Sequence, residues 1–123
     1  MSNRVVHFEI PCDNPQKTMD FFQEVFGWKF EQFGKEEYWS VITGDNEEPG
    51  INGGVMKKRD PNQPLVNSID VSNLDEYLEK IKNAGAPIVV PKTAIPGIGW
   101  MAYFKDPDGN IHGVYQKDSS ASM

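Results

Sequence analysis

The sequence is poor in the residues that build disulfides and metal clusters. Its 123 residues include one cysteine and two histidines. The single cysteine, Cys12, cannot form an internal disulfide, which fits a reducing compartment, so a cytoplasmic protein is expected. No run approaches the ~20 apolar residues of a membrane helix, and no signal peptide pattern opens the chain, so no membrane role is expected.

Basic residues are also in deficit. Twelve Lys and Arg residues are outnumbered by 18 Asp and Glu, which gives a net charge of -6. Because phosphate binding requires a basic face, this balance argues against a nucleic-acid partner. The one basic run, Lys57–Arg59, lies in a polar connector and is interpreted as a solvated linker. The length and the 38% hydrophobic content predict a single folded domain over residues 1–123.

The first half of the chain has the pattern of a strand, a helix and three further strands. Alternate residues are apolar in the first strand, Arg4–Ile10, and Pro11 is expected to end it. Asn14 and Pro15 indicate a helix start, and Gly27 indicates a left-handed helix end. The other three predicted strands are Trp28–Phe33, Tyr38–Thr43 and Ile51–Met56.

The second half repeats this order after a polar connector, Lys57–Pro64. A predicted strand, Leu65–Val71, precedes a helix that begins with an S-x-x-D capping pattern at Ser72 and ends at Gly85. Three more strands are predicted at Pro87–Val90, Gly99–Phe104 and Asn110–Gln116, the last of them after an Asp-Pro-Asp-Gly turn. The small polar tail, Lys117–Met123, is expected to fray.

The two halves, residues 4–56 and 65–116, indicate a duplicated βαβββ unit. Gly50–Met56 and Gly109–Tyr115 align without a gap and share two glycines and one valine. Each helix must cover one face of its sheet, because an amphipathic helix has to bury its apolar side. The predicted fold class is therefore α+β, with two tandem βαβββ modules that curl into a half-barrel with a concave cleft.

Strand alternation assigns one set of side chains to the concave face. That set is His7, Glu9, Asn52, Met56, Ser68, Asp70, Ile111 and Tyr115. Polar groups mixed with some apolar area are typical of a pocket that orients a ligand. His7 and Glu9 are the candidate catalytic residues, since an imidazole titrates near neutral pH. The alternative is that both are polar residues satisfied by their neighbours.

Two tryptophans are further candidates for ligand binding. Trp39 and Trp100 each lie on the predicted third strand of a repeat, so duplication would place them in similar surroundings. An aromatic pair of this kind could clamp a flat or cationic ligand. Packing in the core is the alternative for both residues.

The chain resembles the vicinal oxygen chelate superfamily, which contains glyoxalases, bleomycin resistance proteins and extradiol dioxygenases. The resemblance rests on Val6–Pro11 leading into Phe21–Trp28, on Ile95–Trp100 and on the turn Asp106–Asn110. It extends over nearly the whole chain and implies a glyoxalase-like half-barrel. The reaction stays open, because the superfamily hosts isomerases, lyases, dioxygenases, thiol transferases and plain drug-binding proteins.

The resemblance also locates four metal-ligand positions. Metal-dependent members take one ligand from the first strand and one from the fourth strand of each module. Those positions carry His7, Gly54, Val66 and Gly113 in this sequence. Valine and glycine side chains have no lone pair, and one imidazole alone is a weak site for a divalent ion. No cofactor is therefore expected, and a relocated divalent-metal site built from His7, Glu9 and Asp70 is the alternative.

Three functions remain open from the sequence. The first is a protein that binds a small molecule in its cleft without the family metal. The second is a metal-dependent lyase, isomerase or dioxygenase with relocated ligands. The third is a cofactor-free enzyme in which His7 or Glu9 moves a proton. The resemblance further implies a homodimer, whose cleft could lie within one chain or be shared.

Overall fold

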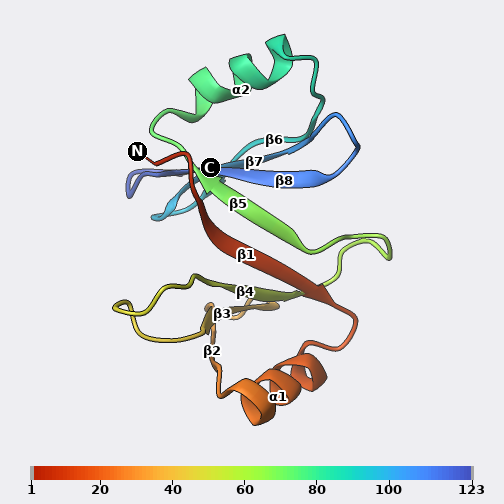
Figure 1. Ribbon diagram of the computed structural model, residues 1–123, viewed down its shortest axis with the longest axis vertical. Coiled ribbons are helices and arrows are strands. Elements are labelled where there is room, and N and C mark those ends of the chain that lie inside the picture. Colours follow the sequence, from red (N-terminus) through yellow and green to blue (C-terminus); the bar gives the residue numbers. More distant parts are fainter. Residues whose placement is uncertain (1, 123) are drawn as a thin grey trace. The chain divides into compact units, whose positions relative to one another are not determined.

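The computed structural model describes residues 2–122 and has an α+β architecture (Figure 1). The elements are β1 (Val5–Cys12), α1 (Pro15–Phe26), β2 (Lys29–Gln32), β3 (Tyr38–Ile42), β4 (Asn52–Lys57), β5 (Val66–Asp70), α2 (Leu74–Asn83), β6 (Ile88–Ile95), β7 (Gly99–Lys105) and β8 (Ile111–Lys117). The βαβββ order occurs twice, which confirms the predicted class and the predicted repetition. Among residues 2–122, no helix is long and apolar enough to span a membrane.

The chain forms two compact units. Residues 7–66 form one, here called the first module, and residues 2–6 with 67–122 form the other, here called the second module. The division falls inside β1 and at the start of β5. Each module is described by itself below.

The first module has its strands in the order β1-β4-β3-β2, with β1 and β4 parallel and the other pairs antiparallel. Helix α1 begins where predicted, because the Asn14 side chain accepts a hydrogen bond from the Lys17 amide at 3.2 Å and Pro15 fits the first turn. It ends at Gly27, whose φ of 74° is left-handed. The helix packs on one face of the sheet over a core of Cys12, Met19, Val41 and Val55.

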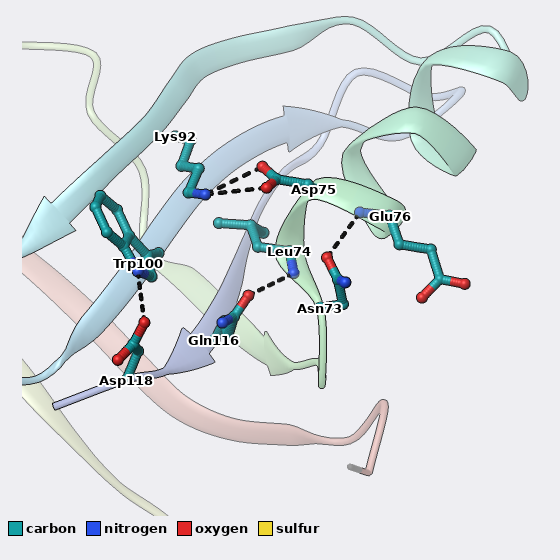
Figure 2. Close-up of polar contacts among 8 residues, drawn as sticks. All are labelled: Asn73, Leu74, Asp75, Glu76, Lys92, Trp100, Gln116 and Asp118. Atoms are coloured by element: carbon teal, nitrogen blue, oxygen red, sulfur yellow. Dashed lines mark hydrogen bonds and ion pairs between the residues drawn. The ribbon is translucent and has the colours of Figure 1, made fainter. Parts of the chain in front are cut away.

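The second module has its strands in the order β5-β8-β7-β6, again with one parallel pair, β5 and β8. Its core consists of Val71, Leu74, Leu78, Ala102 and Val114. The predicted cap at Ser72 is wrong by one residue, because the Asn73 side chain accepts from the Glu76 amide at 3.1 Å (Figure 2). The helix ends with Ala84 as its cap, and Gly85 follows with a φ of 89°.

Two strand ends lie more than one residue from the sequence-based expectation. Strand β1 continues through Pro11 to Cys12, and β6 continues through Pro91 to Ile95. In β6 the proline is tolerated because the strand pairs only with β7 within its module, and the register shifts on either side of Val90.

The expected fraying of the tail is also wrong over the described residues. Ala121 is buried, and its carbonyl oxygen accepts from the Gly97 amide at 3.0 Å. The Asp118 carboxylate accepts from Trp100 Nε1 at 3.1 Å and from the Ser120 hydroxyl at 2.6 Å. A short polar tail is therefore ordered by specific hydrogen bonds that its composition does not reveal. Residue 123 lies outside the described residues.

Candidate functional site

The face of the first module's sheet opposite α1, here called its helix-free face, carries a polar cluster. Phe8 and Ile10 of β1 pack against the core under α1, so His7 and Glu9 point to the opposite face by strand alternation. The register pairs His7 with Asn52 and Glu9 with Gly54 on β4. This confirms the predicted facing of the two β1 residues.

Tyr38 completes this cluster. Its side chain lies over Gly54, so that a Cβ atom added at Gly54 would overlap the Tyr38 hydroxyl and come within 2.9 Å of Tyr38 Cε2. The hydroxyl oxygen lies 3.0 Å from Nε2 of His7. The missing side chain at Gly54 is therefore what allows the phenol of β3 to reach the imidazole of β1.

Burial shifts the pKa of both partners of this hydrogen bond. Desolvation lowers the pKa of His7 below its ordinary value, because a half-buried imidazole is more stable when neutral. Burial, and then the electrostatic effect of Glu9, raises the pKa of Tyr38 far above its ordinary range. Glu9 itself is only 8% exposed. At neutral pH the site thus holds an uncharged imidazole in contact with a protonated phenol.

We expect the His7 imidazole to titrate below pH 6.5 in the folded protein. Because the folded state favours the neutral ring, the unfolded state binds the proton more tightly, and His7 lowers the free energy of unfolding as the pH falls from 6.5 through the folded pKa. Following the histidine NMR signals from about pH 4 to about pH 8, the range in which imidazoles titrate, measures the midpoint of the His7 titration. His112→Asn leaves one histidine signal and assigns it. A midpoint at or above 6.5 would contradict the burial of this ring.

Asn52 and Met56 share the helix-free face but already serve local contacts. Asn52 Oδ1 accepts from the Thr43 amide at 2.9 Å and from the Thr43 hydroxyl at 3.2 Å, which ties β4 to the end of β3. Met56 Sδ accepts from Gln63 Nε2 at 3.7 Å. Their predicted role in ligand binding remains a prediction.

The second module repeats the arrangement with different side chains. Ser68, Asp70, Ile111 and Tyr115 lie on the face opposite α2, as predicted, since Ile69 and Val114 between them contact the helix-side core. Asp70 accepts from the Ser2 hydroxyl at 3.0 Å, and the Tyr115 hydroxyl donates to the Ile98 carbonyl at 3.3 Å. Burial, and then Asp70, raises the pKa of Tyr115. These four residues offer a carboxylate and a phenol but no imidazole.

The two tryptophans do not occupy equivalent positions. Trp39 of β3 pairs with Val55 of β4. The residue equivalent to Val55 in the second module is Val114, but Trp100 pairs with Gln116, two residues further along β8. The two tryptophans are therefore not equivalent in register, because the third strands align with a two-residue offset.

Each tryptophan packs on the helix side of its own module. Trp39 contacts the core under α1, and Trp100 contacts the core under α2. In Figure 2 the Lys92 ammonium lies beside Trp100, 4.7 Å from the ring centroid, and 3.1 Å from both carboxylate oxygens of Asp75. The core reading accounts for these contacts, and a ligand-binding role for either tryptophan stays a prediction.

The four metal-ligand positions implied by the resemblance fall at equivalent places in the two modules. Glu9 pairs with Gly54 and Ser68 pairs with Gly113, and the first-strand positions His7 and Val66 each lie two residues earlier. At Gly54 the Tyr38 ring fills the space in which a carboxylate would stand, and its hydroxyl contacts the one remaining ligand. The residues at these positions therefore do not fit the family metal.

No other group of side chains among residues 2–122 offers a metal site in place of these four positions. Over residues 2–122, no three His, Cys, Asp or Glu side chains gather so that they could hold a metal ion. His112 lies on the α2 side of the second module's sheet, with its ring centroid 5.5 Å from that of Phe104 and its Nε2 2.9 Å from Asp106 Oδ2. This hydrogen bond is the main cause of the strongly lowered pKa of Asp106.

Sequence reasoning missed Tyr38. Its position next to Trp39 was enough to assign it to the face opposite the core, but the reach of its side chain across β4 was not visible. The usable signal was Gly54: a glycine inside a strand often marks a close approach by another group. Register then decides which group approaches, and only the folded sheet shows it.

Comparisons with known proteins agree with this architecture. The family model described as Glyoxalase/Bleomycin resistance protein/Dioxygenase superfamily matches residues 4–112. A member of that superfamily from Vibrio splendidus 12B01 superposes with a TM-score of 0.67 and 19% identity over 94% of this chain and 98% of that one. Methylmalonyl-CoA epimerase from Mycobacterium tuberculosis superposes with a TM-score of 0.68 and 10% identity over 95% and 89%.

A hypothetical protein from Bacillus halodurans C-125 superposes with a TM-score of 0.69 and 13% identity over all of both chains. No curated protein matches the sequence. Identities this low establish the shared fold and carry no information about the reaction.

Proposed function

Since this chain belongs to the glyoxalase/bleomycin resistance protein/dioxygenase superfamily, we propose that it binds a small molecule on the helix-free face of its first module, without the divalent metal of the metal-dependent members. The observation that carries the proposal is the hydrogen bond between His7 and Tyr38 over Gly54. It puts a neutral donor–acceptor pair where the metal-dependent pattern has an imidazole and a carboxylate.

The chemistry of this pair suits recognition of a polar, uncharged group. The phenol stays protonated and the imidazole stays neutral near pH 7, so the pair offers one donor and one acceptor without a net charge. The nearly buried carboxyl of Glu9 lies on the same face and adds acceptor oxygens. A few convergent polar groups on a partly apolar surface are what orients a ligand in a small-molecule site.

A cofactor-free enzyme is the second candidate, and the hydrogen bond between the His7 imidazole and the Tyr38 phenol favours it. A neutral imidazole is ready to accept a proton, and a protonated phenol 3.0 Å away can donate one. In this reading His7 is the base and Tyr38 the acid for a substrate bound against them. Turnover of a bound compound, lost in His7→Asn and in Tyr38→Phe, separates this enzyme from a binding protein.

The proposal is tested first by metal content. Protein purified without chelator is expected to contain far less than one divalent ion per chain, and added Mn²⁺, Ni²⁺ or Zn²⁺ is expected to leave its thermal midpoint unchanged. Stoichiometric metal that disappears in His7→Ala would overturn the metal-free proposal and favour the metal-dependent enzyme.

The second test is ligand binding. A thermal-shift screen of metabolites and antibiotics is expected to give a stabilising compound, and titration calorimetry then measures its dissociation constant. We expect His7→Asn and Tyr38→Phe each to weaken binding at least tenfold, or about 1.4 kcal/mol. The matched control is His112→Asn, because it removes the other histidine, which lies on the α2 side of the second module's sheet. Equal losses in His7→Asn and His112→Asn would contradict the proposed site.

A further inference from the structure

A groove on the helix side of the first module, here called the α1 groove, plays no part in the candidate site. It has a volume of about 280 Å³ and is lined by residues of α1, β2 and β3. Met19, Phe30 and Trp39 form its apolar lining, and the other lining residues are three glutamines and Asp20. Met19 is buried and the two aromatic residues are half-buried. The α1 groove is therefore an aromatic surface edged by amides and one carboxylate.

The negative charge of the α1 groove is not offset by a basic residue. Asp20 Oδ1 accepts from Gln16 Nε2 at 2.8 Å, but Asp20 forms no ion pair among residues 2–122. Lys17 of α1 and Lys29 of β2 do not line the groove. Strand alternation turns Lys29 to the face opposite Phe30, which packs against the core under α1. A ligand of this groove is therefore expected to carry a positive charge.

The second module contains the same chemical groups with a cation in place. Lys92 Nζ lies 4.7 Å from the ring centroid of Trp100 and 3.1 Å from both carboxylate oxygens of Asp75 (Figure 2). Trp100 lies on β7, Asp75 on α2 and Lys92 on β6, which pairs with β7. The tryptophan ring attracts the cation through its π electrons, and the carboxylate neutralises its charge. A primary ammonium is thus held between a tryptophan of the third strand and an aspartate of the helix.

The first module has the tryptophan and the aspartate but no such cation. Trp39 lies on the third strand and Asp20 on the helix, and both line the α1 groove. Among residues 2–122, no lysine or arginine lies over the Trp39 ring. The strand beside Trp39 carries Gln32 opposite it. Because the two tryptophans differ in register, the modules share these chemical groups and not equivalent positions.

We propose that the α1 groove binds the ammonium group of a small primary alkylamine from solution, between the Trp39 ring and the Asp20 carboxylate. Its volume of about 280 Å³ suits a small ligand, since drug-sized molecules occupy pockets of about 300–1,000 Å³. The glutamine side chains at its edge offer carbonyl oxygens that accept from the remaining ammonium protons. The site is separate from the helix-free face and does not depend on the function proposed for that face.

NMR titration with n-butylammonium, which reproduces the lysine side chain, tests the proposal. Phosphate buffer replaces Tris, because Tris is itself a primary ammonium. We expect the indole N–H signal of Trp39 to shift saturably, whereas the signal of Trp100, whose Nε1 already donates to Asp118, stays in place. n-Butanol has the same chain without the charge and should move neither signal. An unmoved Trp39 signal at about 100 mM butylammonium and constant ionic strength, or an equal response to n-butanol, would overturn the proposal.

Removal of the carboxylate tests the charge of the α1 groove. Asp20→Asn is expected to weaken butylammonium binding about threefold, as expected for the loss of an exposed ion pair. Glu24→Gln is the matched control, because Glu24 is an equally charged, exposed residue of α1 that does not line the groove. Equal weakening by both substitutions would reveal an effect of net charge alone and contradict the site. His7→Asn should leave binding unchanged, and loss of binding in this variant would place the amine on the helix-free face instead.

A tethered cation tests the comparison with Lys92. Gln32→Lys places an ammonium on the strand beside Trp39, where it should occupy the α1 groove and abolish the response to butylammonium. Gln32→Met is the matched control, since it loses the same hydrogen bond to the Glu36 carbonyl without adding a charge, and it should still bind. Undiminished binding in Gln32→Lys would contradict the assignment. Tighter binding of an acetylated Gly-Lys-Gly amide than of butylammonium would assign the groove to a lysine of a protein partner and overturn the small-molecule proposal.

Discussion

Gly53→Ala is expected to lower the free energy of unfolding by about 3 kcal/mol, because the new methyl group would collide with the backbone of the neighbouring strand. A Cβ atom at Gly53 would overlap the Phe8 carbonyl oxygen and lie 2.6 Å from Phe8 Cδ1 and Cγ. The carbonyl belongs to β1, which pairs with β4 through this residue. The two strands would have to separate to admit the methyl group. Urea denaturation followed by circular dichroism measures the loss.

The neighbouring glycine provides a matched control. Gly54→Ala introduces the same methyl group, but the atoms it meets belong to the far end of the Tyr38 side chain, which can swing away. We expect a smaller loss of stability than for Gly53→Ala, together with separation of Tyr38 from His7. We therefore expect the NMR titration of His7 to change in Gly54→Ala, and to change in the same direction in Tyr38→Phe, which removes the same hydroxyl contact. Equal destabilisation by both glycine substitutions would contradict this account of the two faces of β4.

Leu74→Ala is expected to cost about 3 kcal/mol of unfolding free energy, the usual range for emptying a fully buried leucine site. Leu74 is 0% exposed and begins α2 at the centre of the second module's core. Its amide donates to Gln116 Oε1 at 2.8 Å, as Figure 2 shows, so its backbone is fixed against β8 as well. Calorimetry or urea denaturation gives the loss directly.

The control for this substitution is Leu65→Ala. Leu65 is 59% exposed, so the same change of side chain removes little buried area and should alter stability by less than about 0.5 kcal/mol. Hydrogen exchange read by mass spectrometry locates the effect of Leu74→Ala. Protection is expected to fall first in β7, β8 and α2, which contact one another. Equal stability of the two leucine variants would show that the core is not centred on Leu74.

The proposed loss of the metal and the proposed gain of the Tyr38 contact have one physical cause. A glycine at position 54 removes a ligand and, by the same absence, opens the space through which a phenol reaches the imidazole. At the equivalent Gly113 of the second module, a Cβ atom would lie 2.6 Å from the Ser68 hydroxyl oxygen. In both modules the space left by the missing glycine side chain is therefore filled by a polar group, the Tyr38 phenol in the first and the Ser68 hydroxyl in the second. Only in the first module does that group contact a histidine.

Local rules in the sequence determined the elements. Asn14, Pro15 and Gly27 set the limits of α1 because capping and left-handed glycine act over a few residues. Alternation alone placed His7 and Glu9 opposite Phe8 and Ile10, and the repetition of the pattern located the four strand positions compared between modules. These are short-range effects, which the order of residues encodes directly.

Pairing between distant strands decided what those rules left open. Strand β6 continued through Pro91, and the third strands aligned so that Trp39 and Trp100 are not equivalent. The contact of Tyr38 with His7 joins residues 31 apart in sequence through the register of three strands. The sequence by itself determined the duplicated βαβββ order and which side chains face away from the helices, because strand alternation is local. Only the tertiary structure decided which of those side chains meet, because register depends on the packing of the whole sheet.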